Sequence, residues 1–213
     1  MLMEKERLEV IEYGKKLLSL RLTQGTSGNI SVFDRETGYL AITPSGMDYM
    51  ELKPEDITIM DLDGNQIDGS RKPSSEIHLH SLVYKNRPDV DTVVHAHSVY
   101  CTTIACLRED LPAVDYMIAV AGKKVKCAEY ATFGTKELAV NVVKALENNR
   151  AVLLANHGVL TCGNGLKESF HILEEVEYVA ELYYRARCIG NPVILDDEEM
   201  SRMLVKFETY GRQ

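Results

Sequence analysis

The stretch Asp91-Thr92-Val93-Val94-His95-Ala96-His97 is the one around which the rest of the chain is arranged. Its apolar run predicts a buried β-strand that leads directly into two histidines separated by one residue. On a strand, residues i and i+2 point to the same face, so both imidazoles would project from one side of the sheet. There they would be close enough to bind one metal ion.

A second histidine pair with the same spacing, His78 and His80, lies in a segment that is predicted to be helical. Two such residues are roughly 200° apart around a helix axis, so they do not share a metal easily. We expect His80, one turn beyond Glu76, to be a buried structural or supporting residue rather than a ligand. The strand setting, and not the spacing, makes His95 and His97 the better candidates.

The composition is ordinary for a globular protein and leaves room for a large hydrophobic core. The 213 residues are 45% hydrophobic and 26% charged, and no linker rich in proline, glycine or serine divides them. We therefore expect a single domain over residues 1–213.

The net charge and the cysteines indicate which binding partners and which cellular compartment to expect. The net charge is −8, and no cluster of lysine and arginine is long enough to bind a polyanion, so neither a nucleic acid nor an anionic membrane is expected as a partner. The N-terminal sequence does not resemble a signal peptide, and no apolar run approaches the ~18 residues of a membrane span. The five cysteines include no C-x-x-C pair. We predict reduced thiols and a cytoplasmic location.

Strand and helix patterns are mixed along the chain. Strands are predicted over residues 39–43, 57–61, 114–120, 126–129 and 151–155. Helices are predicted over residues 4–22, 75–86, 98–107 and 166–189, after Thr135, and from Asp196 or Asp197 to about residue 209. Hairpin-like strands with flanking helices predict one layered α/β domain.

A third histidine, His157, follows the predicted strand 151–155. Together with His95 and His97 it would form the three-ligand set of a catalytic zinc, which leaves one coordination position open. A structural zinc would more often use cysteine pairs, which this sequence lacks. Only the tertiary structure can bring His157 to the other two, and the pattern by itself leaves a structural role for His157 equally open.

Three loops of small polar residues suggest what such a site would act on. They lie at residues 26–29, 43–46 and 72–75 and offer amides and hydroxyls without clustered cations. Such loops can hold a phosphate by neutral hydrogen bonds. A metal and a phosphate pocket beside Glu76 favour proton abstraction next to a carbonyl, with zinc stabilising an enediolate and Glu76 moving the proton. The dipole of the helix that starts here would also explain Glu76.

Several motifs together resemble the class II aldolase/adducin-head family, over essentially the whole chain. The segments that carry the resemblance are QGTSGNIS (24–31), ITPSG (42–46), KPSSEIHLH (72–80), VVHAHSVYCTT (93–103), DYMIAVAG (115–122), YATFGTKEL (130–138), NHG (156–158) and KFETYG (206–211). The resemblance implies a single three-layer α/β/α domain with a central, mainly antiparallel sheet. It also implies a cyclic homotetramer with sites between subunits.

Within the family, the chain is most similar to members that reversibly cleave L-fuculose 1-phosphate to dihydroxyacetone phosphate and L-lactaldehyde. The resemblance implies one zinc per subunit and a proton donor from a neighbouring subunit, Tyr116, at the leaving aldehyde oxygen. Implied zinc ligands are Glu76, His95, His97 and His157, with Glu76 also the acid/base. Implied substrate-binding residues are Thr26, Gly28, Asn29, Ser45, Gly46, Ser74 and Ser75, and implied aldehyde-side residues are Phe133, Phe207 and Tyr210.

Three alternatives remain open. An L-ribulose-5-phosphate 4-epimerase resembles this chain in its metal and phosphate motifs, although such enzymes typically carry aspartate where this chain has Glu76. Another sugar-phosphate aldolase would differ in the aldehyde that it accepts. A non-catalytic scaffold like the adducin head shares the fold but lacks the full metal set.

Overall fold

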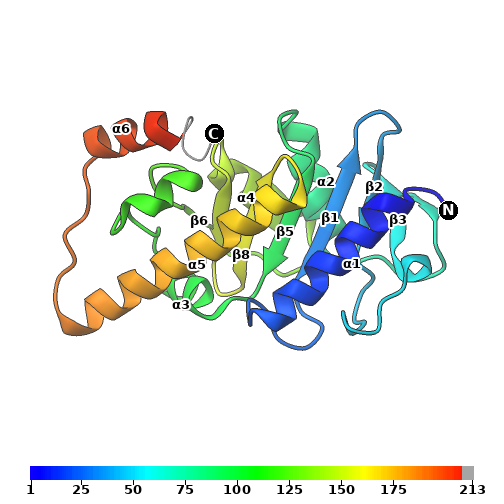
Figure 1. Cartoon of the computed structure of the whole chain (residues 1–213), viewed down its shortest axis with the longest axis horizontal. Helices are drawn as coiled ribbons and strands as arrows, with labels where there is room; N and C mark the ends of the chain where they lie inside the picture. Colours follow the sequence, from blue (N-terminus) through cyan, green and yellow to red (C-terminus); the bar gives the residue numbers. More distant parts are fainter. Residues whose placement is uncertain (208–213) are drawn as a thin grey trace.

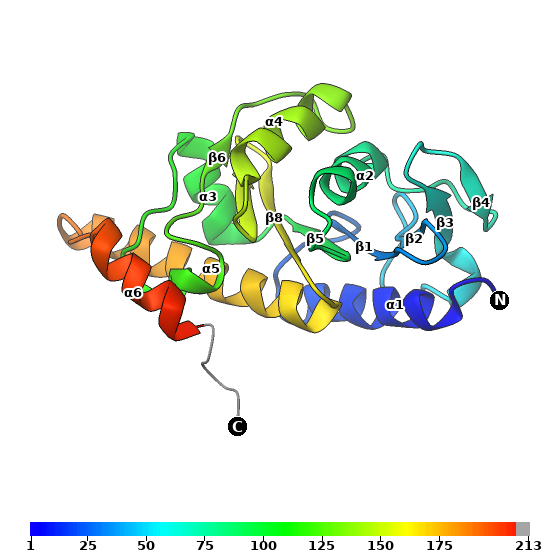
Figure 2. The ribbon, with the colours of Figure 1, turned by 90° about the horizontal axis from the view of Figure 1, so that it is seen from above.

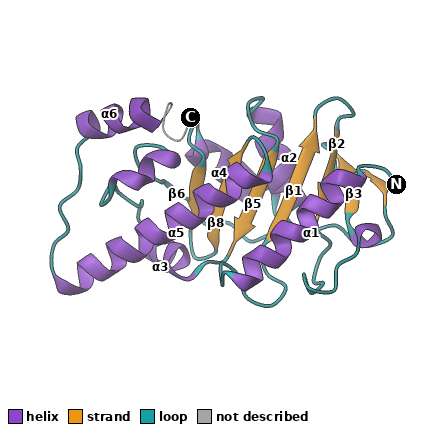
Figure 3. Cartoon of the chain, in the orientation of Figure 1, coloured by secondary structure: helices purple, strands orange, loops and turns teal. Residues whose placement is uncertain are grey.

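One sheet of eight strands forms the centre of the molecule (Figure 1, Figure 3). The computed structural model describes residues 1–207. The strand order is β4-β3-β2-β1-β5-β8-β7-β6, and β6 alone among these strands runs parallel to its neighbour. The strands are β1 (Asn29–Asp34), β2 (Tyr39–Ile42), β3 (Thr58–Asp61), β4 (Gln66–Asp68), β5 (Thr92–Ala96), β6 (Cys127–Ala128), β7 (Ala151–Leu154) and β8 (Gly158–Gly163).

Helices cover both faces of this sheet, as Figure 2 shows from above. The buried side chains of α1, α3 and α5 belong to one hydrophobic cluster, and those of α2 and α4 belong to another on the opposite face. The predicted three-layer α/β/α architecture with a mainly antiparallel sheet is therefore confirmed. The helices are α1 (Glu4–Ser19), α2 (Ile77–Asn86), α3 (Val99–Leu107), α4 (Lys136–Leu146), α5 (Leu166–Ile189) and α6 (Asp197–Phe207), with short 3-10 helices η1 (Pro54–Asp56) and η2 (Tyr116–Val120).

Strand β5 lies fourth from one edge of the sheet and is buried on both faces. Val94 and Ala96 join the cluster beneath α1, α3 and α5, whereas Val93 joins the cluster beneath α2 and α4. Since side chains alternate along a strand, His95 points to the same face as Val93. The N-terminus of α2 lies on that side of the sheet.

Two predictions of local structure were wrong. Residues 114–120 were expected to form a strand, but residues 116–120 form η2, because the side chain of Asp115 accepts a hydrogen bond from the amide of Met117 and caps a helical turn. Strand β8 was not predicted at all. Its sequence, Gly-Val-Leu-Thr-Cys-Gly, is buried along its whole length and therefore lacks the polar alternation of a half-buried strand.

The end of the chain carries α6, which packs against η2. Among the residues that the structure describes, no helix is long and apolar enough to cross a membrane. Tyr210 lies outside the described residues.

Candidate metal centre

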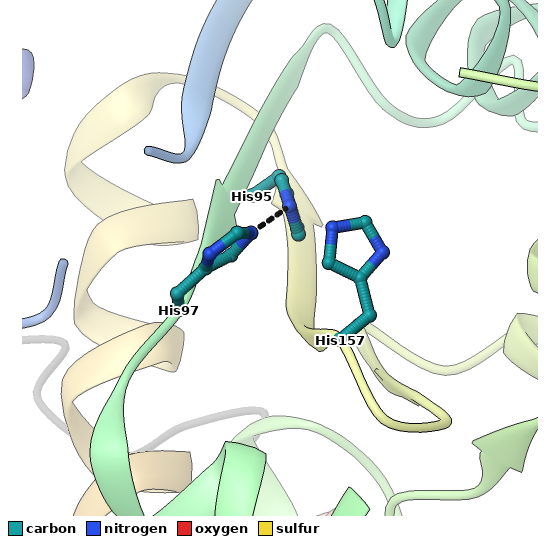
Figure 4. A group of neighbouring side chains, drawn as sticks. All are labelled: His95, His97 and His157. Atoms are coloured by element: carbon teal, nitrogen blue, oxygen red, sulfur yellow. Dashed lines mark hydrogen bonds between the residues drawn. The ribbon is translucent and has the colours of Figure 1, made fainter. Parts of the chain in front are cut away.

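Three imidazoles converge at one end of strand β5 (Figure 4). His95 lies in β5, His97 lies just beyond its end, and His157 lies in the turn between β7 and β8. The ring centroids of the three pairs are 4.9, 4.8 and 4.9 Å apart. The Nε2 atoms of His95 and His97 are 3.0 Å apart, and one nitrogen from each of the three rings lies within 4.8 Å of the others. The structure thus brings the three predicted ligands together.

The pairing of β5 with β8 brings the third histidine to the first two. In this antiparallel register Ala96 faces Val159, and Gly158 follows His157 directly. A Cβ atom on Gly158 would lie 2.4 Å from the backbone oxygen of Ala96. Glycine therefore allows the two strands to approach closely where the histidines meet.

Glu76 adds a carboxylate to the cluster. It is the N-cap residue of α2 and is only 5% exposed. Its Oε2 lies 3.2 Å from Nε2 of His95 and accepts a hydrogen bond of 2.9 Å from the side-chain amide of Asn29. Its Oε1 lies 3.7 Å from Nε2 of His157. The sequence placed Glu76 in the first helical turn, whereas the structure places it one residue before the helix.

The cluster sets the charge of each group. Burial opposes ionisation of Glu76, but the attraction of His95 outweighs it and holds the pKa of that carboxyl well below its usual range. Burial likewise disfavours a charged His95, but the carboxylate of Glu76 raises the pKa of His95. Burial lowers the pKa of His97 and of His157 to about 4. At neutral pH the latter two rings are uncharged, which is the state that binds a metal.

The donor set fits a divalent ion. Oε1 of Glu76 is buried and has no hydrogen-bond partner within residues 1–207. An unpaired buried carboxylate oxygen is costly, and a cation beside it would remove that cost. Three imidazole nitrogens with an acidic oxygen are ligands that catalytic zinc sites use. The four side chains therefore offer a donor set that fits a divalent ion.

A cavity of about 350 Å³ opens beside the cluster. Glu76, His97 and His157 line it, and His95 lies fully buried behind them. Among its described lining residues there is no lysine or arginine. All the residues expected to bind substrate line the same cavity: Thr26, Gly28, Asn29, Ser45, Gly46, Ser74 and Ser75.

The loop that carries Gly28 requires glycine. Its φ is +79°, and a Cβ atom would lie 2.7 Å from the backbone oxygen of His95. Any other residue would be strained and would push the loop away from β5. The loop at residues 26–29 is thus held directly against the histidine strand.

The residues expected on the aldehyde side are divided between two places. Phe133 is 65% exposed and lines the cavity. Tyr116 is 49% exposed on η2 and is not among the cavity residues; its ring centroid lies 6.4 Å from that of Phe207 on α6. Tyr116 and Phe207 therefore form a separate aromatic pair near the described end of the chain.

Three cavity residues outside the predicted loops were missed from the sequence, namely Tyr130, Ala131 and Asn156. Tyr130 lines the wall beside Phe133, and Asn156 lines the cavity next to His157. Arg108 joins them, because its guanidinium lies 5.7 Å from the centre of the Tyr130 ring and its Nε donates a hydrogen bond of 2.9 Å to Oδ1 of Asn156. The sequence offered a signal for two of them, since Asn156 directly precedes His157 and Tyr130 lies three residues before Phe133.

The other histidine pair is split, as expected for a helix. His80 is fully buried, and burial lowers the pKa of His80 to about 3. His78 lies on another side of α2, where it lines a separate cavity with Lys85 and Lys136.

Comparisons with known proteins agree with this geometry. The sequence matches the family described as class II aldolase and adducin N-terminal domain over residues 8–184. It is 51% identical to the 5-deoxy-D-ribulose 1-phosphate aldolase of Bacillus thuringiensis serovar kurstaki, over 213 residues and 100% of both chains. The L-fuculose phosphate aldolase of Escherichia coli strain K12 is 42% identical over 98% of both chains.

A solved structure described as L-fuculose 1-phosphate aldolase superposes with a TM-score of 0.96 at 56% identity, over 98% of both chains. The matched region includes every residue of the metal cluster and its cavity. The chain belongs to the class II aldolase and adducin N-terminal domain family.

Proposed function

We propose that this protein is a zinc-dependent class II aldolase that reversibly splits a ketose 1-phosphate into dihydroxyacetone phosphate and a short aldehyde. The observation that carries this proposal is the meeting of three histidines, an unpaired oxygen of Glu76 and three small-polar loops around one cavity. Membership of the class II aldolase family and the relatives named as sugar-phosphate aldolases support it.

The zinc ion that Glu76, His95, His97 and His157 would hold supplies a Lewis acid for the carbonyl oxygen of the substrate. Glu76 acts at the carbon beside that carbonyl, where its Oε1 takes up or returns the proton. The carboxylate suits this task because Oε1 has no competing hydrogen-bond donor among the described residues.

The small-polar loops bind the phosphate. Their amides and hydroxyls supply neutral donors, which hold a phosphate by dipoles rather than by cations. Glycine at position 28 brings one of these loops against β5, so the phosphate lies a short distance from the metal. With its phosphate in these loops, a ketose 1-phosphate would have its carbonyl carbon beside the histidines and Glu76.

The aromatic wall receives the aldehyde end. The two relatives are named for 5-deoxy-D-ribulose 1-phosphate and L-fuculose phosphate. Both sugars end in a methyl group, and their cleavage releases acetaldehyde and L-lactaldehyde respectively. We take L-fuculose 1-phosphate and 5-deoxyribulose 1-phosphate as the two candidate substrates. Phe133 and Tyr130 offer apolar ring surface to the methyl group. Phe207 lies beside Tyr116 and would reach the aldehyde end from the neighbouring subunit, and the family resemblance implies the same role for Tyr210.

The acid at the aldehyde oxygen is Tyr116, supplied by a neighbouring subunit. Its hydroxyl is on an exposed residue outside the cavity of its own chain, so an active site with this acid needs a second copy. The homotetramer expected from the family resemblance would provide it. We also propose that residues 1–213 act as one domain, because the cavity draws on residues from both halves of a single sheet.

A substrate panel tests the proposal. The purified, zinc-loaded protein would be incubated with 5-deoxyribulose 1-phosphate, L-fuculose 1-phosphate, rhamnulose 1-phosphate and ribulose 5-phosphate. Release of dihydroxyacetone phosphate from one of the 1-phosphates is the expected result. Epimer formation from ribulose 5-phosphate without aldol cleavage would instead identify an epimerase. Failure of the protein to retain zinc during loading, together with no turnover of any of these substrates, would identify a scaffold.

A further inference from the structure

A line of buried polar side chains lies between helix α2 and strand β1, behind the cavity. Glu76, His80 and Tyr84 are spaced by four residues and share one side of α2, whereas Asn29 and Ser31 are spaced by two on one face of β1. All five are buried, with exposed fractions of 5%, 0%, 2%, 4% and 0% in that order.

Hydrogen bonds join these side chains into a continuous chain. His80 Nε2 lies 2.5 Å from Oδ1 of Asn29, and Nδ2 of Asn29 donates to Oε2 of Glu76 at 2.9 Å. On its other side, His80 Nδ1 lies 2.6 Å from Oγ of Ser31, which in turn lies 2.6 Å from the hydroxyl of Tyr84.

The direction of the bonds among Glu76, Asn29 and His80 follows from the carboxylate at their end. An ionised carboxylate only accepts, so Asn29 turns its NH₂ group to Glu76 and its Oδ1 to His80. His80 must then donate from Nε2. On the other side of the ring, the hydroxyl of Ser31 can serve Nδ1 as donor or acceptor, and the hydroxyl of Tyr84 also donates to the backbone oxygen of Ser31 at 3.0 Å. A proton on Nε2 of His80 therefore satisfies the part of the chain that leads to Glu76.

A purely structural contact between α2 and the sheet would not need these groups. Buried polar groups cost free energy unless every partner is present, and apolar side chains would pack this contact more simply. The neighbouring contact is of the apolar kind, since Phe33 stacks on Tyr84 with ring centroids 5.0 Å apart. The polar chain leads from there to Oε2 of Glu76 and leaves Oε1 unpaired.

We propose that His80 is a positioning residue, whose Nε2–H fixes the side-chain amide of Asn29 and thereby holds Oε2 of Glu76, so that Oε1 is the oxygen that exchanges the proton with substrate. This inference rests on the proposed aldolase function and adds the device that orients its base. Without the His80 donor, the amide of Asn29 is free to turn its oxygen toward the carboxylate, which would repel Glu76 from its place.

The first test reads the tautomer directly and does not depend on activity. Nitrogen-15 NMR of histidine-labelled protein, with His80→Gln used to assign the signal, is expected to show His80 protonated at Nε2. The same pattern should persist in protein from which metal has been stripped. A His80 ring without a proton on Nε2 would overturn the proposal.

The second test compares His80→Leu with His80→Gln. Leucine removes the donor, and kcat is expected to fall roughly 10- to 100-fold, the scale of one hydrogen bond to a charged group, while metal content stays normal and KM changes less than about threefold. Glutamine keeps an N–H donor and should recover kcat to within about threefold of wild type. His78→Gln, the same change two residues away on α2, is the control and should leave kcat unchanged.

The results for the His80 variants either support or refute its positioning role. A folded, metal-loaded His80→Leu protein with wild-type kcat would refute the proposal, as would equal losses in His80→Leu and His80→Gln. If His80→Leu does not fold, the positioning role is tested by the NMR measurement of the proton on Nε2 and by kcat of His80→Gln. Failure of the aldolase function itself would be seen differently, as absence of cleavage in the wild type with every ketose 1-phosphate, while the NMR signal would still report the state of His80.

Discussion

The imidazole Nδ1 of His95 lies 2.9 Å from the backbone oxygen of Val159 on the adjacent strand. A carbonyl oxygen only accepts, so Nδ1 carries a proton and Nε2 is the atom left to bind a metal. That Nε2 faces Glu76 and His97 at 3.2 and 3.0 Å. The backbone of β8 therefore decides which nitrogen of a β5 side chain enters the site, as is usual for metal-binding histidines.

Removal of His157 should abolish tight metal binding. We expect about one divalent ion per chain in the wild type and an affinity roughly 100-fold or more weaker in His157→Ala, since even residues behind the ligands change affinity 10- to 100-fold. Metal analysis after dialysis against buffered zinc measures this. His171→Ala, an exposed histidine on α5, is the matched control. Equal metal content in both variants would exclude the three-histidine site.

Replacement of Glu76 by glutamine should separate metal binding from proton transfer. Glutamine has the same shape and the three histidines remain, so Glu76→Gln should keep its metal. Exchange of the proton on dihydroxyacetone phosphate should slow by about 10²–10⁴-fold, the usual contribution of a general base. Solvent deuterium exchange followed by NMR measures the rate. Near-normal exchange would refute the role of Glu76.

Tyr116→Phe should slow aldol cleavage rather than the proton exchange that depends on Glu76. Loss of the hydroxyl should slow aldol cleavage by about 10²–10⁴-fold while proton exchange at dihydroxyacetone phosphate changes little, because the two protons belong to different products. Parallel cleavage and exchange assays distinguish these rates. Tyr178→Phe, an exposed tyrosine on α5, controls for surface effects. Equal slowing of both reactions would count against an aldehyde-side acid.

Asp89 should make stability depend on pH in acid. Hydrogen bonds from Arg87, at 2.8 Å to each carboxylate oxygen, lower the pKa of Asp89 to about 2 from an ordinary value of 3.8. A lowered folded-state pKa stabilises the protein above the ordinary value, and this stabilisation is lost as the pH falls from about 3.8 toward 2. Asp89→Asn should therefore lower the free energy of unfolding at pH 7. We expect a decrease of under about 1 kcal/mol, because the Asp89 side chain is half-exposed and solvent screens its interaction with Arg87. Urea unfolding should show this difference shrinking toward pH 3. A difference that stays constant would contradict the prediction.

Arg7 should be a major stabilising residue of the first helix. It is 1% exposed, and its guanidinium donates to the backbone oxygens of Leu2, Pro54 and Ile57 and to Asp68. Arg7→Met would leave three carbonyl oxygens without this donor, and we expect a loss of about 2–4 kcal/mol in the free energy of unfolding.

Chemical denaturation compares this variant with Arg202→Met. Among residues 1–207, Arg202 pairs with the exposed or half-exposed Glu198 and Glu199 of α6, so its loss should cost less than about 0.5 kcal/mol. A similar loss in the free energy of unfolding for the two variants would show that the buried contacts of Arg7 do not stabilise the protein more than a surface ion pair does.

Local sequence determined the elements that are long or strongly patterned. The boundaries of α5 (Leu166–Ile189) agree with the prediction because the apolar face repeats over many turns and Gly190 follows. The same holds for β5, whose apolar run marked it as buried. The sequence also separated the two H-x-H pairs, because helical and extended backbones project residues i and i+2 differently.

Short elements were predicted less well, since local sequence carries little information about them. Residues 114–120 have the composition of a strand, yet residues 116–120 form η2, where the carboxylate of Asp115 accepts a hydrogen bond from the amide of Met117. Strand β8 shows no alternation, because both of its faces are buried.

The assembly of the site was decided by tertiary structure alone. His95 and His97 come as a pair from one segment, but His157 reaches them only through the register of β8 on β5, and Glu76 only through the packing of α2 on that face. Register and packing are set by burial of the whole core, which no local window of sequence contains. The sequence therefore determined which side chains were available for the chemistry, and the long-range pairing of strands and helices decided which of their atoms meet.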